Sequence, residues 1–447
     1  MSDRIAEARA GREPRIAVGV IADKPAIRFQ LHGAFVDGRG QSWPAGEYLA
    51  EAADVGMRVA GARSERAPEL RLTPGDPLAD HFSLLATIGI DFHWQRDEEQ
   101  RFAGALHIIA SGAGRLTAID EVPLETYLAS VICSEMGAGS PPEFLRSHAV
   151  ISRSWLLAQL VPRGETAAPV DEPGERIRWY DRDAHRDFDV CADDHCQRYQ
   201  GLTRITSPWV AAAVQDTRGQ VLTHAGAVCD ARFYKCCGGV TEDFGVAWSD
   251  TAIPYLVPVR DAADPALPEP PLTDEQAARA FITGDPPAFC NCRDAALLSS
   301  ILPSYDQETA DFYRWQVRLT AVSAAELVSR KLGVEVGRVL ALTPLSRGLS
   351  GRIDRLRIAG ERQALVVGKE LEIRRALSES HLYSSAFVVD TEGDPARPDA
   401  FVLHGAGWGH GVGLCQIGAA AMAAQGYDHR QILAHYYPGA QLERWYR

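Results

Sequence analysis

Four potential metal ligands fall within twelve consecutive positions of this sequence and restrict the path of the chain there. They are His185, Cys191, His195 and Cys196. Thiolates and imidazoles in this number suit a tetrahedral Zn²⁺ ion, and four protein ligands would leave no open position for a substrate. We therefore predict a structural zinc site that holds residues 185–197 as a loop. The spacing lacks two Cys-x-x-Cys pairs, so the alternative is coincidence, with buried cysteines and surface histidines.

Length and charge exclude several classes of protein. The chain has 447 residues, of which 46% are hydrophobic and 23% charged, an ordinary composition for a soluble globular protein. The net charge of −13 argues against a nucleic-acid-binding protein, which would carry a basic surface. The N-terminus has no apolar stretch typical of a signal peptide, and no run is long enough for a transmembrane segment. As written, the chain would be cytoplasmic; an upstream start or a removed leader would change that expectation.

The pattern of short β-rich runs and a few helices predicts an α+β fold. We expect a mixed, β-rich core with long loops and an inserted small α/β subdomain. Residues 1–14 are predicted to be disordered, 15–262 and 393–447 to form the core, and 263–392 to form the insertion and the subdomain. Within the core, residues 105–110 and 115–119 should form a hairpin, and strands are expected around 210–221. In the subdomain, a strand at 315–320 should precede a helix at 324–332.

Two helices are predicted after the hairpin. The first begins near Pro123, because proline is tolerated in a first helical turn. The second runs from Ser140 to about Leu160, with Ser140 as N-cap and Glu143 three residues later, which is the spacing of a capping box.

One glutamate of the first helix lies on an apolar stripe. The stripe consists of Leu124, Leu128 and Val131, and Glu135 continues it at the next helical position. Glu121 and Glu125 fall off the stripe and are expected in solvent. A buried carboxyl group has a raised pKa and can act as a general acid. The alternative is a glutamate at a fraying helix end that points into solvent.

A glycine-rich segment, residues 407–418, is the second chemical signal. It does not have the pattern of a Walker A loop or of a dinucleotide-binding fingerprint. Trp408 offers a flat apolar face and His410 a titratable nitrogen, a combination that suits a sugar ligand. The equally weighted alternative is a tight structural turn in which His410 is hydrogen-bonded in the core.

Most of the nine cysteines occur in groups. Cys229 lies near Cys236 and Cys237, and Cys290 near Cys292, whereas Cys133 and Cys415 stand alone in the sequence. Clusters favour metal binding or catalysis in a reducing compartment and disulfides in an oxidising one. The sequence leaves open whether Cys229, Cys236, Cys237, Cys290 and Cys292 form disulfides or a second metal site.

Six segments, in order, resemble motifs of the SpoIID/LytB family. They are Leu124–Met136, His148–Trp155, Cys191–Gln197, Gly238–Glu242, Gly407–Gln416 and His435–Gly439. The resemblance spans roughly residues 15–447 and implies a protein directed at peptidoglycan. SpoIID-type members are lytic transglycosylases that cut glycan strands lacking stem peptides, and LytB-type members enhance cell-wall amidases. Either function would normally be exercised in the cell envelope.

The resemblance also implies roles for individual residues. Glu135 stands at the family's catalytic acid/base position, and His185, Cys191, His195 and Cys196 stand at the zinc positions of some members. We expect the substrate cleft to be lined by Arg153, Trp408, His410 and Gln416. Such an enzyme needs one carboxylate, because the muramyl 6-hydroxyl replaces water. The rivals are a non-catalytic glycan-binding enhancer of an amidase and a zinc hydrolase with an open metal position.

The chain departs from the family at several positions. Cys415 stands where the family has serine, Gly137 where it has proline, and Cys236–Cys237 replaces a serine-rich step. The absence of an export signal conflicts with the expectation of a cell-wall substrate.

Overall fold

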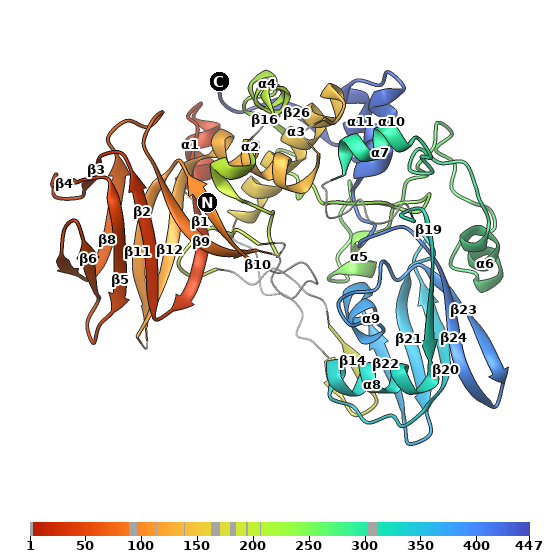
Figure 1. Cartoon of the computed structure of the whole chain (residues 1–447). Helices are drawn as coiled ribbons and strands as arrows, with labels where there is room; N and C mark the ends of the chain where they lie inside the picture. Colours follow the sequence, from red (N-terminus) through yellow and green to blue (C-terminus); the bar gives the residue numbers. More distant parts are fainter. Residues whose placement is uncertain are drawn as a thin grey trace. The chain divides into compact units, whose positions relative to one another are not determined.

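The computed structural model describes residues 3–88, 96–112, 114–137, 139–161, 170–178, 185–193, 195–205, 207–302 and 311–447 (Figure 1). The chain forms two compact units, and each is described separately. Unit 1 contains Met1–Pro162, Asp183–Val221 and Leu442–Arg447, and unit 2 contains Arg163–Arg182 and Leu222–Gln441. The chain passes between the units within β16 (Gln220–His224) and β26 (Gln441–Arg444).

Unit 1 is built from short strands followed by helices. Its elements are α1 (Asp3–Arg9), β1 (Arg15–Lys24), β2 (Ala26–His32), β3 (Phe35–Asp37), β4 (Ser42–Trp43), β5 (Gly46–Ala52), β6 (Met57–Gly61), β7 (Glu65–Ala67), β8 (Glu69–Pro74), β9 (His81–Ile88), β10 (Arg96–Phe102), β11 (Ala105–Gly112), β12 (Arg115–Pro123), α2 (Leu124–Glu135), α3 (Pro142–Gln159), β15 (Val190–Cys191), a 3₁₀ helix η1 (Gly201–Arg204) and α4 (Pro208–Asp216).

The strands of unit 1 form two sheets packed face to face. One has the order β15-β1-β12-β11-β8-β3-β4 and the other β10-β9-β2-β5-β6-β7, with β12 of the first against β2 and β5 of the second. Side chains alternate between core and solvent along β2 and β8, as expected for sheets with one buried face. The predicted hairpin is confirmed, because β11 and β12 pair antiparallel from Ala105–Glu121 to Gly112–Arg115.

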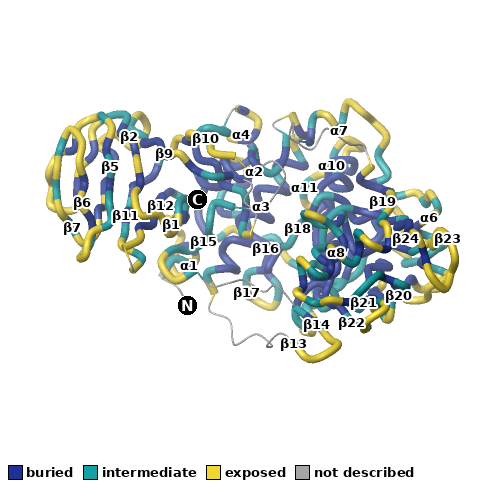
Figure 2. Tube along the Cα trace, turned by 60° about the horizontal axis from the view of Figure 1, so that its bottom comes forward, coloured by how far each residue is buried: buried dark blue, intermediate teal, exposed yellow. Residues whose placement is uncertain are grey.

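Helices α2, α3 and α4 pack on one another, and α2 also contacts β1 and β12. Most residues of α2 and α3 are buried, as the dark segments in Figure 2 show. Helix α2 begins directly after Pro123, as predicted. A helix that is covered on several sides buries more than one stripe of residues.

Three sequence predictions for unit 1 are wrong. Part of the segment expected to be disordered, 1–14, forms α1, because Ile5 and Ala8 lie on one face and are buried. Helix α3 has Pro141 as its N-cap, and the Ser140 hydroxyl instead donates to the Gly137 carbonyl at 2.7 Å. The strands expected at 210–221 are mostly helix α4, since Pro208 occupies the first turn and alanines of high helix propensity follow.

Unit 2 contains the remaining elements. They are β13 (Val170–Glu172), β14 (Glu175–Ile177), β17 (Ala227–Val228), β18 (Phe233–Tyr234), α5 (Phe244–Ala247), α6 (Glu275–Thr283), α7 (Ala295–Ile301), β19 (Arg314–Thr320), α8 (Ala321–Leu332), β20 (Val339–Arg347), β21 (Ile353–Gly360), β22 (Ala364–Gly368), α9 (Glu370–Ala376), β23 (Phe387–Asp394), β24 (Arg397–Ala406), β25 (Leu414–Cys415), α10 (Gln416–Ala424) and α11 (His429–Tyr436).

The main core of unit 2 lies between helices and two sheets of order β13-β14-β22-β21-β20 and β19-β24-β23. Helix α8 packs on β19, β20 and β24, and its ends are set by the Thr320 N-cap and by Gly333 in the left-handed region. The predicted strand and helix of the subdomain are therefore confirmed. Together the two units confirm the α+β class.

The predicted domain boundaries differ from the observed units. Residues 222–262 and 393–441, expected in the core, belong to unit 2. One reason is strand pairing: β24, expected in the core, is the central strand of the sheet that contains β19, expected in the subdomain. Pairing between strands distant in sequence leaves no compositional signal at a boundary. Among the described helices, none has the length and apolar character needed to cross a bilayer.

A buried ion pair joins α2, α3 and the C-terminus inside unit 1. The guanidinium of Arg153, fully buried, donates to both carboxylate oxygens of Glu125 at 2.9 and 2.6 Å. The Tyr446 hydroxyl donates to the same carboxylate at 2.5 Å. The prediction that Glu125 lies in solvent is wrong. Arg153, which we expected in a substrate cleft, is instead buried in the interior of the unit.

We predict that Arg153→Met destabilises unit 1 by about 3–5 kcal/mol, because it leaves the Glu125 carboxylate buried without a cation. Urea unfolding followed by circular dichroism measures the loss. The matched control is Arg146→Met, which breaks a more exposed pair with Asp216 and should cost less than about 1 kcal/mol. Equal unfolding midpoints for the two variants would contradict a stabilising role of the buried pair.

Candidate functional site

The four predicted metal ligands come together in unit 1. Their ligand atoms all lie within 4.8 Å of one another. Nε2 of His185 lies 3.3 Å from Sγ of Cys196, and Nδ1 of His195 lies 3.6 Å from Sγ of Cys196 and 3.8 Å from Sγ of Cys191. Two sulfurs and two imidazole nitrogens in such a group fit the donor set that a single tetrahedral ion requires.

Electrostatics within the group favour a metal-binding thiolate. A hydrogen bond from the Cys196 thiol is the main cause that lowers the pKa of Cys191 to about 2; burial opposes the shift, and contacts with both histidines support it. A thiolate at neutral pH is the form that binds a metal.

The ligand loop is anchored to the first sheet by strand β15. It pairs parallel with β1, with Val190 opposite Val18 and Cys191 opposite Gly19. The Ala192 amide donates to the Gly19 carbonyl at 3.0 Å. Gly19 is required here because a Cβ atom would stand 2.5 Å from the ring of Phe188. The loop thus starts from a fixed sheet edge.

Beyond the ligands, the chain runs along one face of α2. The Tyr127 hydroxyl donates to Oε1 of Gln197 at 3.3 Å, and the Gln200 amide donates to Oγ of Ser130 at 3.2 Å. Between them, the Arg198 amide donates to Oε1 of Glu135 at 3.0 Å. The segment that follows the metal ligands therefore positions the predicted catalytic carboxylate.

Glu135 is the last residue of α2 and is half-buried. The apolar stripe placed Glu135 on the buried face of the helix, and the structure shows it only partly buried there. The stripe ends with the helix, so its final residue reaches the edge of the packed region. A half-buried carboxylate can contact both the protein and a bound molecule.

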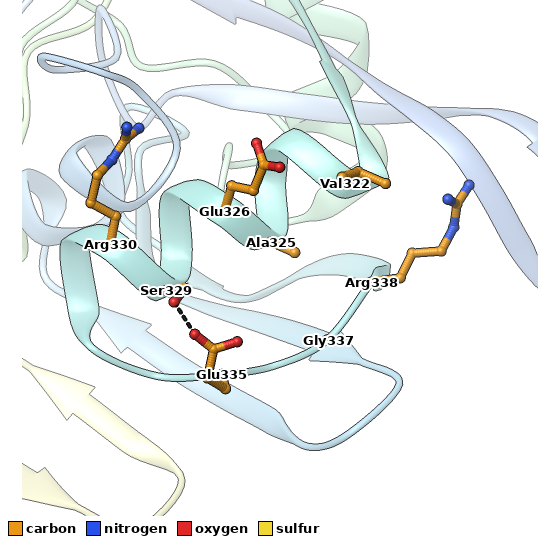
Figure 3. Close-up of a pocket in the computed structure, with 8 residues that line it drawn as sticks. All are labelled: Val322, Ala325, Glu326, Ser329, Arg330, Glu335, Gly337 and Arg338. Atoms are coloured by element: carbon orange, nitrogen blue, oxygen red, sulfur yellow. Dashed lines mark hydrogen bonds between the residues drawn. The ribbon is translucent and has the colours of Figure 1, made fainter.

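Two hollows differ in what surrounds them. A hollow of about 110 Å³ in unit 1 is lined by Cys191, Arg198 and Tyr199 among others, so it adjoins the ligand loop. A larger hollow of about 510 Å³ lies in unit 2 beside α8 and the segment 335–338 (Figure 3). In the larger one Ser329 donates a hydrogen bond to Glu335, and its lining includes none of the predicted site residues. The smaller hollow is the one next to candidate chemistry.

The other predicted substrate-binding residues lie in unit 2. Trp408 is half-buried, with its ring 4.4 Å from that of Tyr383 and 4.9 Å from that of Phe312. Gln416 is buried at the start of α10. The structure thus groups Glu135 with the metal ligands in unit 1, and Trp408 with His410 and Gln416 in unit 2.

His410 is held on both sides of its ring. Its Nδ1 accepts from the Val412 amide at 3.1 Å, and the ring also has a backbone hydrogen bond with Phe233. Although part of the residue is exposed, burial of the ring lowers the pKa of His410 well below its usual range, with Arg232 and Arg352 adding to the effect. This geometry favours the structural turn over a titrating contact.

The structure shows a second group of side chains that could bind a metal. Cys237, Asp261, Cys290 and Cys415 lie together in unit 2, all buried. Cys415, which stands alone in the sequence, is therefore close to other cysteines in the fold. Burial would raise the pKa of Cys415, but hydrogen bonds from Cys236, Cys237 and Cys290 lower it well below its usual range. Burial, followed by the charge of Cys415, raises the pKa of Asp261 to about 6.

The signal for this group was present in the sequence. Cys415 and the pair Cys236–Cys237 are the positions at which the chain departs from the family pattern by replacing serine with cysteine. Asp261 gave no such signal, since an isolated aspartate has no distinguishing spacing.

Two described families match the chain. The family "Stage II sporulation protein" matches residues 112–224, which include α2, α3 and the ligand loop. A family described as "Domain of unknown function (DUF8618)" matches residues 242–413, within unit 2. The first match therefore covers α2, α3, α4 and the ligand loop of unit 1, whereas strands β1–β10 lie outside it.

Curated relatives agree with this match. "Stage II sporulation protein D" of Bacillus subtilis (strain 168) is 24% identical over 334 residues, covering 72% of this chain and 75% of the relative. The protein of that name from Bacillus amyloliquefaciens is 25% identical over the same shares. An "Amidase enhancer" of Bacillus subtilis (strain 168) is 25% identical over 241 residues, which are 52% of this chain and 32% of the relative. Residues 112–224 thus match the family "Stage II sporulation protein", and the chain is similar both to SpoIID proteins and to an amidase enhancer.

We predict that removing metal from the first site loosens the loop without unfolding the sandwich. Dialysis against a chelator should increase hydrogen exchange at the amides of Asp189–Ala192 and Arg198–Gln200, because their order depends on the adjoining ligands. Mass spectrometry of exchanged peptides measures the change, and the β11–β12 hairpin is the internal control. Unchanged exchange in the loop after verified metal loss would contradict this role.

Proposed function

We propose that the protein cleaves peptidoglycan glycan strands as a lytic transglycosylase, on strands that lack stem peptides. Similarity to the SpoIID/LytB family supports a role at the cell wall. The observation that carries the proposal is the geometry of Glu135. Its carboxylate lies half-buried at the end of α2 and accepts a hydrogen bond from the backbone of the metal-ligand loop.

The reaction needs a single acid that also serves as a base. Protonated Glu135 donates its proton to the glycosidic oxygen between N-acetylmuramic acid and N-acetylglucosamine, and the bond from that oxygen to the muramyl C1 breaks. The muramyl 6-hydroxyl oxygen bonds to C1, and its proton passes to the Glu135 carboxylate. The product ends in a 1,6-anhydro-muramyl sugar, no water is consumed, and the enzyme regains its proton.

A zinc ion held by His185, Cys191, His195 and Cys196 would have four protein ligands and a closed coordination sphere. We therefore assign it the task of fixing the loop, and we assign no water-activating role to it. Through the loop, it would fix the Arg198 amide on Glu135. A zinc hydrolase, which needs an open position, is accordingly disfavoured.

We also propose a substrate contact at Trp408. Trp408 has a partly exposed ring braced by Tyr383 and Phe312, which suits a platform for a sugar face. His410 and Gln416 are proposed to shape the backbone of the same segment. Arg153 has no place in the proposed contacts, because it is fully buried with Glu125.

A second candidate function is a non-catalytic, glycan-binding enhancer of a cell-wall amidase. The similarity to the relative named "Amidase enhancer" favours it. In this case Glu135 would be a structural residue, and the glycan would bind without being cut.

We predict that Glu135→Gln lowers the rate of strand cleavage by about 10²–10⁴-fold, because the amide can neither donate nor recover the proton. Purified peptide-free glycan strands are incubated with each protein, and mass spectrometry counts 1,6-anhydro-muramyl ends. Glu143→Gln, which changes a half-buried glutamate at the start of α3, is the matched control and should keep the rate.

The same assay distinguishes the second candidate. Intact strands with the unaltered protein, together with stimulation of an added amidase that Glu135→Gln does not diminish, would reject the transglycosylase and support the enhancer.

A further inference from the structure

The second group of ligand side chains joins four segments that are far apart in the sequence. Cys237 follows β18, Asp261 lies in the segment before α6, Cys290 precedes α7 and Cys415 ends β25. Their exposed fractions are 2% or less. Three thiols and a carboxyl group are costly to bury in one place unless they bind a common partner.

The spacing of these groups fits one metal ion. Sγ of Cys237 lies 3.3 Å from Sγ of Cys290 and 3.3 Å from Oδ2 of Asp261, and all four ligand atoms lie within 4.8 Å of one another. A tetrahedral ion bonded to sulfur at about 2.3 Å places its sulfur ligands roughly 3.8 Å apart. A cluster of several irons would hold its thiolates on different metal atoms and therefore further apart.

The sulfur atoms are surrounded by backbone donors. The Cys237 amide donates to Sγ of Cys415 at 3.2 Å, the Gly418 amide to the same atom at 3.4 Å, and the Gly239 amide to Sγ of Cys237 at 3.3 Å. Amides directed at sulfur stabilise the thiolate, which is the form that a metal requires.

The carboxylate is oriented in the same way. The Tyr436 hydroxyl donates to Oδ1 of Asp261 at 2.6 Å, and the Cys290 amide donates to Oδ2 at 2.9 Å. A Cβ atom at position 418 would stand 2.3 Å from the Tyr436 hydroxyl and 2.6 Å from Asp261, so glycine is required for this close approach. Partners that fix a ligand's orientation are typical of metal sites.

We infer that Cys237, Asp261, Cys290 and Cys415 form a second metal site, which binds one Zn²⁺ ion. Sulfur-rich tetrahedral donor sets favour zinc over the hard cations Mg²⁺ and Ca²⁺. Four protein ligands close the coordination sphere, so the ion is structural. The assignment of this site does not rest on the proposed glycan cleavage, although the ion would lie next to the segment that carries Trp408.

The ion would anchor the glycine-rich segment of unit 2. Cys236 and Trp408 exchange two backbone hydrogen bonds, at 3.0 and 2.7 Å, next to the ligand Cys237. At the other end of the segment, Tyr234 pairs with Cys415 in the parallel strands β18 and β25. The metal would thus fix both the start and the end of residues 408–415.

The experiment counts zinc in the full-length protein. The chain is purified under reducing, oxygen-free conditions, loaded with Zn²⁺, freed of excess metal and analysed by inductively coupled plasma mass spectrometry. We expect two zinc ions per chain, one for each ligand group. Cys290→Ser with Cys415→Ser should retain one, and Cys191→Ser with Cys196→Ser should also retain one.

The control is Cys229→Ser, a buried cysteine outside both groups, which should keep two. Retention of one ion in the Cys290/Cys415 variant also shows that unit 1 remains folded. A single ion in the unaltered protein that only the Cys191/Cys196 variant loses would overturn the second site. So would thiol titration showing that Cys237 and Cys290 form a disulfide in the metal-loaded protein.

If the Cys290/Cys415 variant fails to fold, the Cys191/Cys196 variant decides the matter. Loaded with Co²⁺ in place of zinc, it should show the intense sulfur-to-cobalt absorption of a tetrahedral thiolate site. Lack of this absorption would overturn the proposal.

The fourth ligand has its own test. Asp261→Asn should weaken zinc binding about 10-fold or more, measured by competition with a chromophoric chelator. Cys236→Ser removes a buried thiol that is hydrogen-bonded to Cys290 and Cys415 but lies outside the ligand group, and it should have a smaller effect. The opposite order of effects would overturn the assignment of Asp261.

Discussion

The order of one loop without regular structure determines whether Glu135 has a defined position. The described residues 192–193 and 195–200 contain neither helix nor strand, yet they supply the Arg198 amide that binds the Glu135 carboxylate. Ordering the backbone of a loop costs about 1–2 kcal/mol per residue. A hydrogen bond contributes only about 0.5–1.5 kcal/mol net. Contacts with Tyr127 and Ser130 cannot offset that cost alone, whereas binding of a structural zinc ion can contribute on the order of 10 kcal/mol.

Unit 2 also contains a segment whose ordering needs additional support. The segment 407–415 is rich in glycine, so ordering its backbone has a high entropic cost. In unit 1 the ligands are two cysteines and two histidines from one short stretch, so that group fixes a loop locally. In unit 2 the ligands come from four distant segments, so that group acts as a cross-link through the interior. Both would order backbone that secondary structure leaves without support.

The sequence predicted those features that depend on neighbouring residues. The grouping of His185, Cys191, His195 and Cys196, the β11–β12 hairpin and the start of α2 at Pro123 were all correct, because each is set by residues within about a dozen positions. The unit boundaries were wrong, because β24, expected in the core, pairs with β19 of the subdomain over a long sequence separation. The burial of Glu125 was not predicted for a related reason. Its ion-pair partner Arg153 lies 28 residues away on another helix.

The cysteines that depart from the family pattern are best understood together. A single cysteine in place of serine at position 415 would bury a thiol without altering its surroundings. Here Cys237, Cys290 and Cys415 meet at one point, with Asp261 oriented toward them by Tyr436 and the Cys290 amide. Loss of any one of them would leave the others as buried polar groups with an incomplete set of partners, which is costly. The four side chains are therefore expected to act together. Each of the three buried thiols is explained by the presence of the other two.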